Sequence, residues 1–402
     1  MSPTALLTLG RLPVALELAR ALHAAGWRVV VAEPLPLHLC RVSRAVARCR
    51  TLVAPCEDAA RYLDELARIV VEEGASLVVP VSEETVHVAA LRERLPAGVA
   101  LACPSREALL ALHDKWRFAT RARALGLPVP ATAPASSEAA AAIAASGPYV
   151  SKPRLSCSGV GVVLHDGPGP LDPAVRDERH LVQSRLPGAA LCAQALAVDA
   201  RVRALVAYRS LLDAGSVSVC FERVAVPEDV RRTVDAIVGD ARWSGPIAFD
   251  FIADSAGRWC PIECNPRATS GLHLLPPTAI VEAIEAAATG GDRRRPPVAR
   301  SPAVAEDATE RVALGGRRQE FWSALAELEG RALRGRFERG AWGRLVTTPD
   351  VDWSGRDPLP FLTMIFTGAP LLWRALLARR AITEVTMADM GWYADPDGDG
   401  GR

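Results

Sequence analysis

Lysine is almost absent from this chain of 402 residues. Of its 47 basic residues, only Lys115 and Lys152 are lysines, and the rest are arginines. Arginine presents a rigid planar fork, whereas lysine is a compact charge on a flexible stem. A site that holds a slim cation beside a phosphate would keep its lysines. Drift in a composition that favours arginine is the other explanation, and composition alone leaves both open.

An excess of charge and a long apolar run are also missing. The 47 basic residues face 46 acidic ones, so composition gives no reason to expect a nucleic-acid or membrane-surface partner. No stretch of about 20 uninterrupted apolar residues is present to predict a transmembrane helix. The segment Met1–Leu9 lacks the basic region and long apolar core of a signal peptide. We therefore expect a cytoplasmic protein.

Paired cysteine motifs are absent as well. The nine cysteines include no CxxC pair, which argues against a zinc module and a disulfide scaffold. Cys260 and Cys264 flank Glu263, an arrangement open to interpretation as a redox or metal pair. Small buried thiols beside a functional strand are the interpretation we favour.

The N-terminal pattern predicts a parallel sheet covered by helices. A strand over Ala5–Leu9, a helix over Pro13–Ala25 and a strand over Trp27–Glu33 form a β-α-β unit. The turn after Gly10 has no second or third glycine to admit a pyrophosphate, which argues against a dinucleotide site. The length of the chain favours two to three domains.

The rest of the chain divides by composition. Further helices are expected over 59–73, 105–125 and 133–146, and strands over 76–81, 149–152, 162–165, 180–186, 190–199, 201–208, 247–253 and 259–265. We place domains at 1–103, 104–290 and 304–402, with a Gly- and Pro-rich linker over 291–303. In the last domain, the apolar segment Phe361–Ala378 favours core or dimer packing over a membrane contact.

A lysine stands directly before a loop of small residues. Lys152 ends a predicted strand and is followed by the loop Ser156–Gly161. This order would put the ammonium near nucleotide phosphates while backbone N–H groups of the loop cover them. Lys115 precedes Lys152 by 37 positions. A lone glycine-rich loop is weak evidence, but the combination with two rare lysines indicates a phosphate site.

Three oxygen donors are predicted to converge on neighbouring strands. Glu263 and Asn265 share one face of an extended strand because they are two residues apart. Asp250, on another strand, can meet them across the ladder. Hard oxygen donors of this kind suit Mg²⁺, which takes its remaining ligands from water and nucleotide phosphate. Surface carboxylates on edge strands are the alternative, but alternation with Phe249 and Phe251 indicates strands with a buried face.

Taken in order, these motifs resemble the ATP-grasp superfamily, in the branch related to carbamoyl phosphate synthetase and biotin carboxylase. The resemblance covers about residues 1–290 and is carried by Asp114-Lys115, Gly126–Pro130, the Lys152 strand and loop, Val182-Gln183 before Pro187-Gly188, and Ile262–Arg267. It implies an α/β and α+β architecture: a Rossmann-like preATP-grasp domain over 1–103, an ATP-grasp domain of two subdomains over 104–290, and an extra C-terminal domain of unknown role.

The resemblance also implies a set of site residues, with ATP bound between the two subdomains. Phosphates would be held by Lys115, Lys152, Ser156, Ser158, Gly159 and Gly161, and adenine by backbone groups around Val182, Gln183 and Ser184. Asp250 and Glu263 would hold one Mg²⁺, and Glu263 and Asn265 a second, with Mn²⁺ as an alternative metal. Arg267, with Lys152, would stabilise the transferred phosphoryl group.

The implied reaction phosphorylates a small carboxylic acid to an acyl phosphate, which an amine then attacks to form an amide, releasing ADP and phosphate. A homodimer is the expected assembly. Ser184, Ala189 and Ala190 stand where the family carries acids for the hinge and the ribose. This departure keeps a catalytically silent ATP-binding regulatory protein open as an alternative. A carboxylase-type enzyme that uses bicarbonate is another.

Four further residues are candidates for substrate binding. Ser270, Gly271 and His273 follow Arg267 and are expected to line the acyl side of the site. His273 is a candidate substrate contact or base, and a structural histidine is equally consistent with the pattern. Glu83, at the end of a parallel strand, could recognise a substrate amine. An acid that stabilises a helix N-terminus is the alternative for Glu83.

Overall fold

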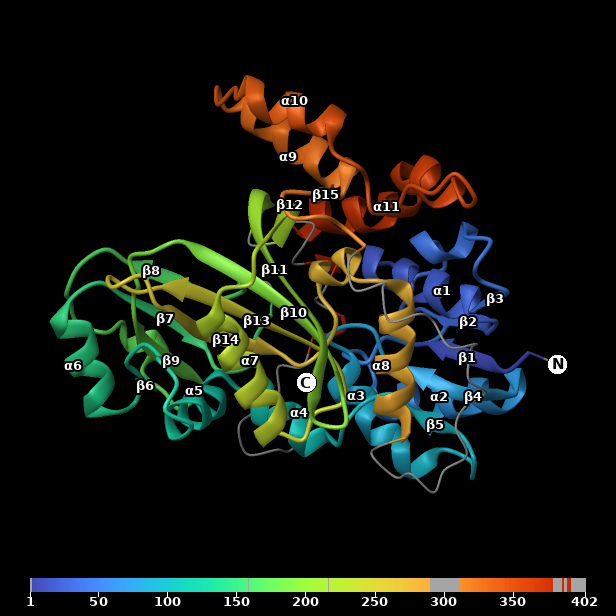
Figure 1. The fold of residues 1–402 in the computed structure, drawn as a ribbon, viewed down its shortest axis with the longest axis horizontal. Helices are drawn as coiled ribbons and strands as arrows, with labels where there is room; N and C mark the ends of the chain where they lie inside the picture. The colour runs from blue at the N-terminus through green and yellow to red at the C-terminus, as the bar shows by residue number, and fades with distance from the viewer. Residues whose placement is uncertain are drawn as a thin grey trace.

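The structure, a computed structural model, describes residues 2–157, 159–215, 217–289, 311–378, 385–386 and 389–391. It contains three sheets (Figure 1). The N-terminal sheet and its helices lie on one side of the molecule, and the two other sheets lie on the opposite side. The predicted linker 291–303 lies outside the described residues.

The first sheet confirms the predicted parallel arrangement, with strand order β3-β2-β1-β4-β5 and every neighbouring pair parallel. Its elements are β1 (Thr4–Leu7), α1 (Pro13–Ala24), β2 (Arg28–Ala32), the 3-10 turn η1 (Leu39–Val42), β3 (Arg48–Arg50), α2 (Ala59–Glu73), β4 (Ala75–Val79), α3 (Thr85–Val88), η2 (Ala89–Arg94) and β5 (Ala100–Leu101). The side chain of Asp58 caps the start of α2, and Gly74 ends that helix in the left-handed conformation.

The second sheet is small and antiparallel, with strand order β6-β9-β7-β8. Its elements and the helices beside it are α4 (Arg106–His113), α5 (Lys115–Ala124), β6 (Thr132–Pro134), α6 (Glu138–Ser146), β7 (Tyr149–Pro153), β8 (Val163–His165), η3 (Pro173–Val175) and β9 (His180–Ser184). The alanine-rich face of α6 packs with Tyr149 and Val182 in a small core of its own.

The third sheet has six antiparallel strands in the order β14-β13-β10-β11-β12-β15. Its elements are β10 (Ala190–Val198), β11 (Arg201–Ala214), β12 (Val217–Val224), α7 (Glu228–Asp240), β13 (Gly245–Ala253), β14 (Trp259–Asn265), η4 (Ser270–Leu274), α8 (Pro277–Thr289) and β15 (Arg317–Gln319). Because β15 pairs with β12, the chain beyond the predicted linker returns to this sheet.

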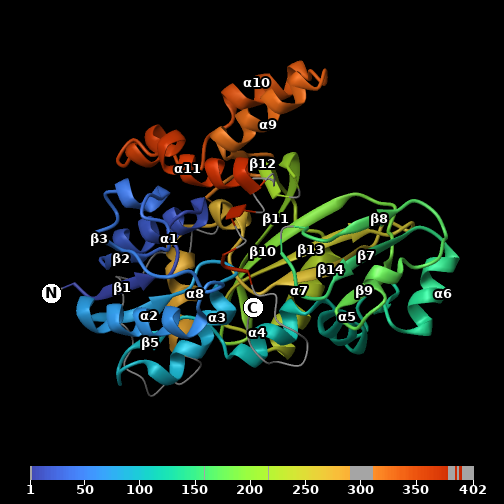
Figure 2. The same ribbon diagram turned by 180° about the vertical axis from the view of Figure 1, so that it is seen from behind.

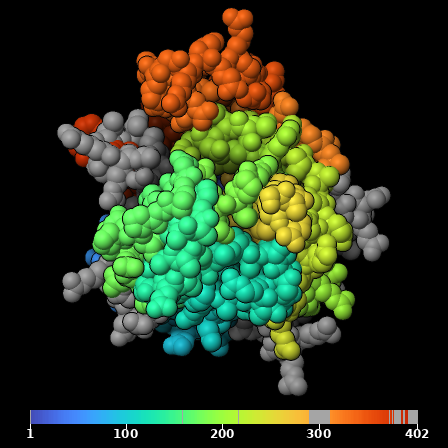
Figure 3. Space-filling model, turned by 90° about the vertical axis from the view of Figure 1, so that its left-hand side faces the viewer, coloured from blue at the N-terminus to red at the C-terminus, as the bar shows by residue number. Residues whose placement is uncertain are grey.

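Three helices complete the described chain: α9 (Phe321–Leu333), α10 (Arg339–Thr347) and α11 (Leu359–Ala378). Seen from behind, they lie above both halves of the molecule (Figure 2). α9 packs against β11 and β12, whereas α11 packs against η1 of the N-terminal region. In the space-filling view, the orange part of the chain projects above the green and yellow parts (Figure 3). Within the described residues, no helix is both long and apolar enough to cross a membrane.

Two helix predictions were wrong. The helix expected over 105–125 is two helices, α4 and α5, because Asp114 adopts an extended conformation (φ −66°, ψ 111°) and caps the second helix with its side chain. The helix expected over 133–146 begins only at Glu138, after the strand β6, where the Ser137 side chain caps it. In both places a capping side chain overrides the helical pattern.

Candidate functional site

The predicted oxygen donors meet where β13 and β14 pair. Asp250 lies directly opposite Glu263 across this antiparallel ladder, and Asn265 lies on the same strand two residues beyond Glu263. Asn265 donates a hydrogen bond from Nδ2 to Asp250 Oδ2 at 3.0 Å. The structure therefore brings all three side chains together at one point on the sheet.

The pKa values of the two carboxyl groups are shifted in opposite directions. Burial and the nearby charge of Glu263 raise the pKa of Asp250. Burial acts to raise the pKa of Glu263 too, but the charges of Lys115 and Lys152 outweigh it and lower that pKa. Like charges this close resist ionising together, and a divalent cation would remove the conflict. The donor chemistry therefore fits Mg²⁺ or Mn²⁺.

A cation here would depend on ligands from outside the protein. Across the described residues, no group of three or more His, Cys, Asp and Glu side chains is placed to hold a metal ion. Asp250, Glu263 and Asn265 offer two carboxylates and an amide, fewer ligands than the octahedral shell of Mg²⁺ requires. Water and nucleotide phosphate would supply the rest.

Both lysines are buried beside these carboxylates. The ammonium of Lys115 is 3.5 Å from Glu263 Oε2 and donates to the backbone oxygen of Ser156 at 2.7 Å. The ammonium of Lys152 donates to Gln183 Oε1 at 3.0 Å and to the backbone oxygen of Ile262 at 3.3 Å. Burial lowers the pKa of Lys152 to about 8, although Glu263 counteracts this shift. Two cations, one from α5 and one from β7, therefore lie beside one carboxylate pair.

Arg154 positions Lys115 and was missed by sequence reasoning. Its Nη2 donates to Asp114 Oδ2 at 2.7 Å, and its backbone oxygen accepts from the Lys115 backbone N–H at 3.1 Å. Asp114 is the cap of α5, so this buried pair ties the helix start that carries Lys115 to the end of β7. The only sequence signal was the position of Arg154, two residues after Lys152.

The small-residue loop follows β7. Ser156 is buried, and its hydroxyl is 3.4 Å from the Lys115 ammonium. Gly159 and Gly161 are exposed and have φ values of 67° and 74°, in the left-handed region that favours glycine. A Cβ on Gly161 would lie 2.7 Å from Pro153 Cγ. Ser158, also predicted to bind phosphate, lies outside the described residues.

The predicted adenine strand is β9, between β6 and β7. Val182 is buried in the core of the small sheet, and Gln183 uses its side chain to hold Lys152 and to donate to Thr132 Oγ1 at 2.9 Å. The Ser184 backbone N–H donates to the Ala131 oxygen at 2.8 Å. An adenine contact by Ser184 would therefore use one of its other groups. Thr132, which orients Gln183, was not identified from the sequence.

The partly buried Arg267 and the buried Glu83 form an ion pair that links the N-terminal region to the end of β14. Arg267 Nε donates to Glu83 Oε1 at 2.8 Å, and its Nη2 lies 3.4 Å from Asn265 Oδ1. Burial acts to raise the pKa of Glu83, but Arg267 and His113 outweigh it and lower that pKa. The guanidinium thus connects the candidate metal ligands to Glu83, 184 residues away in sequence.

The segment after Arg267 is the turn η4. His273 is buried, and its Nδ1 is 3.1 Å from Glu17 Oε2 on α1. Gly271 packs so closely that a Cβ would lie 2.5 Å from the Gln194 Cβ. Ser270 is half-buried. Both His273 and Gly271 thus have packing roles, and substrate binding by the three residues stays a prediction.

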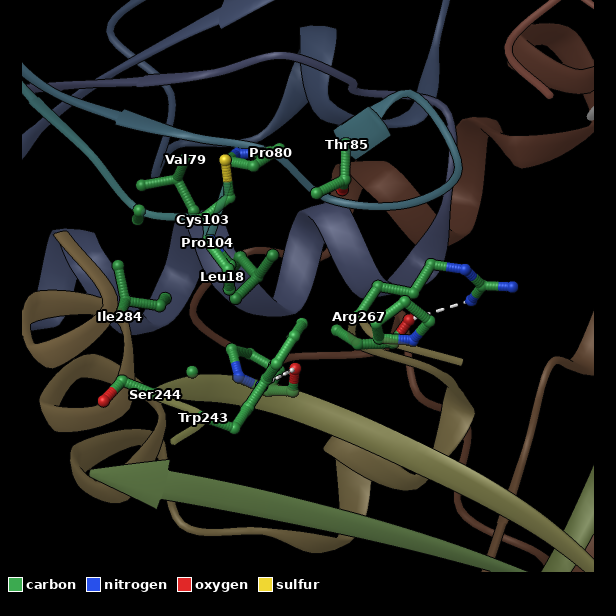
Figure 4. Close-up of a pocket in the computed structure, with 15 residues that line it drawn as sticks. Leu18, Val79, Pro80, Thr85, Cys103, Pro104, Trp243, Ser244, Arg267 and Ile284 are labelled. Atoms are coloured by element: carbon green, nitrogen blue, oxygen red, sulfur yellow. Dashed lines mark hydrogen bonds between the residues drawn. The ribbon is translucent and has the colours of Figure 1, made fainter. Parts of the chain in front are cut away.

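A cavity of about 30 Å³ lies between the N-terminal sheet and β13 (Figure 4). Leu18, Val79, Cys103, Trp243 and Ile284 give it a largely apolar lining. The Arg267 guanidinium points away from this apolar group in Figure 4. The two lysines and the paired carboxylates do not line it. With room for about one or two waters, it is too small for a nucleotide or a substrate.

Comparison with known proteins agrees with this geometry. Residues 112–271 match the ATP-grasp domain. The biotin carboxylase domain of Hydrogenobacter thermophilus 2-oxoglutarate carboxylase is 17% identical, with a TM-score of 0.59 over 74% of this chain and 71% of that one. N5-carboxyaminoimidazole ribonucleotide synthetase from Thermus thermophilus is 17% identical, with a TM-score of 0.54 over 70% and 77%.

Biotin carboxylase from Campylobacter jejuni is 14% identical, with a TM-score of 0.59 over 79% of this chain and 74% of that one. No curated protein matches the sequence. At these identities the solved structures establish the fold, and the matched domain spans both lysines, both carboxylates and Arg267. Residues 112–271 therefore form an ATP-grasp domain.

Proposed function

We propose that this protein is an ATP-dependent ligase that activates a small carboxylic acid as its acyl phosphate and couples it to an amine. The observation that carries the proposal is the convergence of Lys115, Lys152, Asp250 and Glu263 in an ATP-grasp domain. Phosphoryl transfer requires cations on the phosphates and carboxylates that hold metal, and little covalent chemistry from the protein. The Hydrogenobacter thermophilus neighbour contains MgADP, which supports the same cofactors here.

In the proposed reaction, Lys115 and Lys152 bind and orient the phosphates of ATP. Asp250, Glu263 and Asn265 would hold Mg²⁺, or Mn²⁺ in its place, which neutralises charge on the phosphates as it develops. An oxygen of the acid attacks the γ-phosphorus, the bond to ADP breaks, and Arg267 stabilises the transferred group. The amine then attacks the acyl carbon, and phosphate leaves with one of the acid's oxygens.

Arg267 has a competing partner in this structure. It is paired with the buried Glu83, so a substrate that uses Arg267 must share it with Glu83 or displace Glu83. A positively charged substrate amine beside Glu83 would neutralise the charge of the Glu83 carboxylate. The substrate carboxylate could then approach Arg267. This arrangement supports an acid or acceptor that carries an amino group near its carboxylate.

The neighbours favour a second candidate function. Their names include biotin carboxylase and N5-carboxyaminoimidazole ribonucleotide synthetase, and one structure contains bicarbonate. Bicarbonate presents the same oxygen nucleophile as a carboxylic acid, so the same site could phosphorylate it. A catalytically silent ATP-binding protein is the remaining alternative, motivated by Ser184, Ala189 and Ala190 in place of the family's acids.

The proposal is tested by ADP and phosphate release from MgATP with separate pools of amino acids, other small acids and bicarbonate. The blank is Glu263→Gln, which keeps the shape of the side chain but removes its charge. Release that requires an acid pool supports the ligase, and release with bicarbonate alone supports the carboxylase. ATP binding without release in any pool supports the silent protein. Near wild-type release by both Glu263→Gln and Lys152→Met would contradict the site assignment.

A further inference from the structure

Helix α11 is apolar on two faces, and only one of them is covered. Thr367, Leu371 and Ala375 lie on the buried face, which packs against η1. The other face is exposed and follows helical spacing; we call it the α11 face, and it consists of Leu362, Ile365, Phe366, Ala369, Trp373 and Leu377. A helix that is apolar all round is normally buried. The α11 face therefore indicates a contact with another molecule.

The exposed area of this face is sufficient for a specific interface. The five large side chains are 55–69% exposed. Since an aromatic side chain presents about 150–250 Å² and an aliphatic one somewhat less, they expose roughly 600 Å². Two such faces together would bury about 1,200 Å², the lower bound for a stable protein–protein interface. Isolated exposed apolar residues need no explanation, but a contiguous patch of this size does.

The order of residues along the helix is symmetric. Phe366 precedes Ala369 by three positions, and Trp373 follows Pro370 by three. Leu362 precedes Ala369 by seven, and Leu377 follows Pro370 by seven. Two antiparallel copies that cross between Ala369 and Pro370 would thus pair Phe366 of one with Trp373 of the other. The small side chain of Ala369 at the crossing would let the two helices approach closely.

We propose that the α11 face binds the same face of a second copy of this chain, in a symmetric antiparallel dimer. Isologous two-fold contacts are the commonest form of self-association, and they require a self-complementary surface such as this one. A membrane surface fits less well. Helices that lie in the interface carry many Lys and Arg residues on their polar side, whereas α11 has one charged residue, Arg374.

The first test is a disulfide across the proposed axis. Cys56, which is exposed, is replaced by serine to remove background cross-linking. Ala369→Cys in this background should give a covalent dimer under mild oxidation, because residues beside a two-fold axis approach within disulfide reach. Leu333→Cys is the matched control, since Leu333 is 90% exposed on α9, outside the α11 face. Equal cross-linking of the two variants would overturn the proposal.

The second test is the mass in solution by light scattering. The wild-type chain should show twice 42.8 kDa, and Phe366→Glu and Trp373→Glu should each show 42.8 kDa. Leu333→Glu should remain dimeric. A wild-type monomer at all concentrations, or a dimer that persists in Phe366→Glu, would overturn the proposal. So would a wild-type monomer that floats with vesicles of phosphatidylcholine and phosphatidylglycerol, which would assign the face to a membrane surface.

Discussion

Lys152 Nζ donates to Gln183 Oε1 at 3.0 Å, so the two neighbouring strands β7 and β9 fix the direction of the buried ammonium. Gln183 is held in turn by Thr132, to which its Nε2 donates. The glutamine therefore does more than occupy the strand that is expected to contact adenine: it aims a lysine toward the carboxylates of β13 and β14.

Gln183→Leu should weaken MgATP binding. The substitution removes the acceptor that orients Lys152, and a hydrogen bond to a charged group contributes about 1.5–3 kcal/mol. We expect the dissociation constant, measured by calorimetry, to rise about ten- to hundred-fold. The control is Ser146→Ala on α6, which removes an exposed hydroxyl that donates to the backbone oxygen of Ile143 at 2.8 Å. Equal affinities for the two variants would show that Gln183 does not position the lysine.

MgATP affinity should fall as the pH rises through about 8. Burial lowers the pKa of Lys152 to about 8, so this side chain loses its charge above that pH in the nucleotide-free protein. Phosphate favours the charged form, and binding at pH 9 should therefore take up a proton that binding at pH 6 does not. Calorimetry in buffers of different ionisation enthalpy measures this uptake. An affinity that is constant from pH 6 to 9, with no uptake, would contradict the prediction.

Gly271→Ala should destabilise the protein through packing. An added Cβ would lie 2.5 Å from the Gln194 Cβ and 2.6 Å from Tyr208 Cε1. Overpacking of this kind costs about 1–3 kcal/mol of unfolding free energy. Gly239→Ala in α7 is the matched control, because its Cβ would meet open space and alanine favours a helix by about 0.5–1 kcal/mol. Thermal unfolding should separate the two variants, and similar melting temperatures would refute the packing argument.

Glu320→Gln should make the protein less sensitive to a rise in pH from about 4.5 to 7. Burial raises the pKa of Glu320 to about 7 from an ordinary value near 4.5. The folded state then holds a proton that the unfolded state has released, so stability is lost as the pH rises from about 4.5 through 7. Glutamine stays neutral and should raise the melting temperature at pH 8 relative to wild type but leave it nearly unchanged at pH 4.5. An equal effect at both values would argue against this titration.

Parts of this fold were predictable because local signals agreed with tertiary packing. The helix α2 has the bounds expected from the sequence, with Asp58 as its cap and Gly74 as its stop. The strand β14 also has the bounds expected from the sequence, Trp259–Asn265. Where one residue decides the outcome through a distant partner, prediction failed. Asp114 breaks a helical pattern and caps α5, and Arg154 from another element holds it there.

The candidate site was predictable only in part for the same reason. Glu263 and Asn265 are two residues apart, so strand geometry predicted that they share a face. Lysine is so rare in this chain that composition alone singled out Lys115 and Lys152 as candidates. The ion pair of Arg267 with Glu83 spans 184 residues, and no spacing or periodicity connects them. The pairing of His273 with Glu17 likewise depends on how η4 meets α1. Such contacts are products of the tertiary fold.

The central claim, activation through an acyl phosphate, is tested most directly by oxygen transfer. The acid that stimulates ADP release is prepared with ¹⁸O in both carboxylate oxygens and incubated with MgATP, the enzyme and its amine. If the acid is phosphorylated before the amine attacks, the released phosphate will carry one ¹⁸O atom from the acid. Release of unlabelled phosphate, with ADP still formed, would mean that water attacks ATP and would contradict the account.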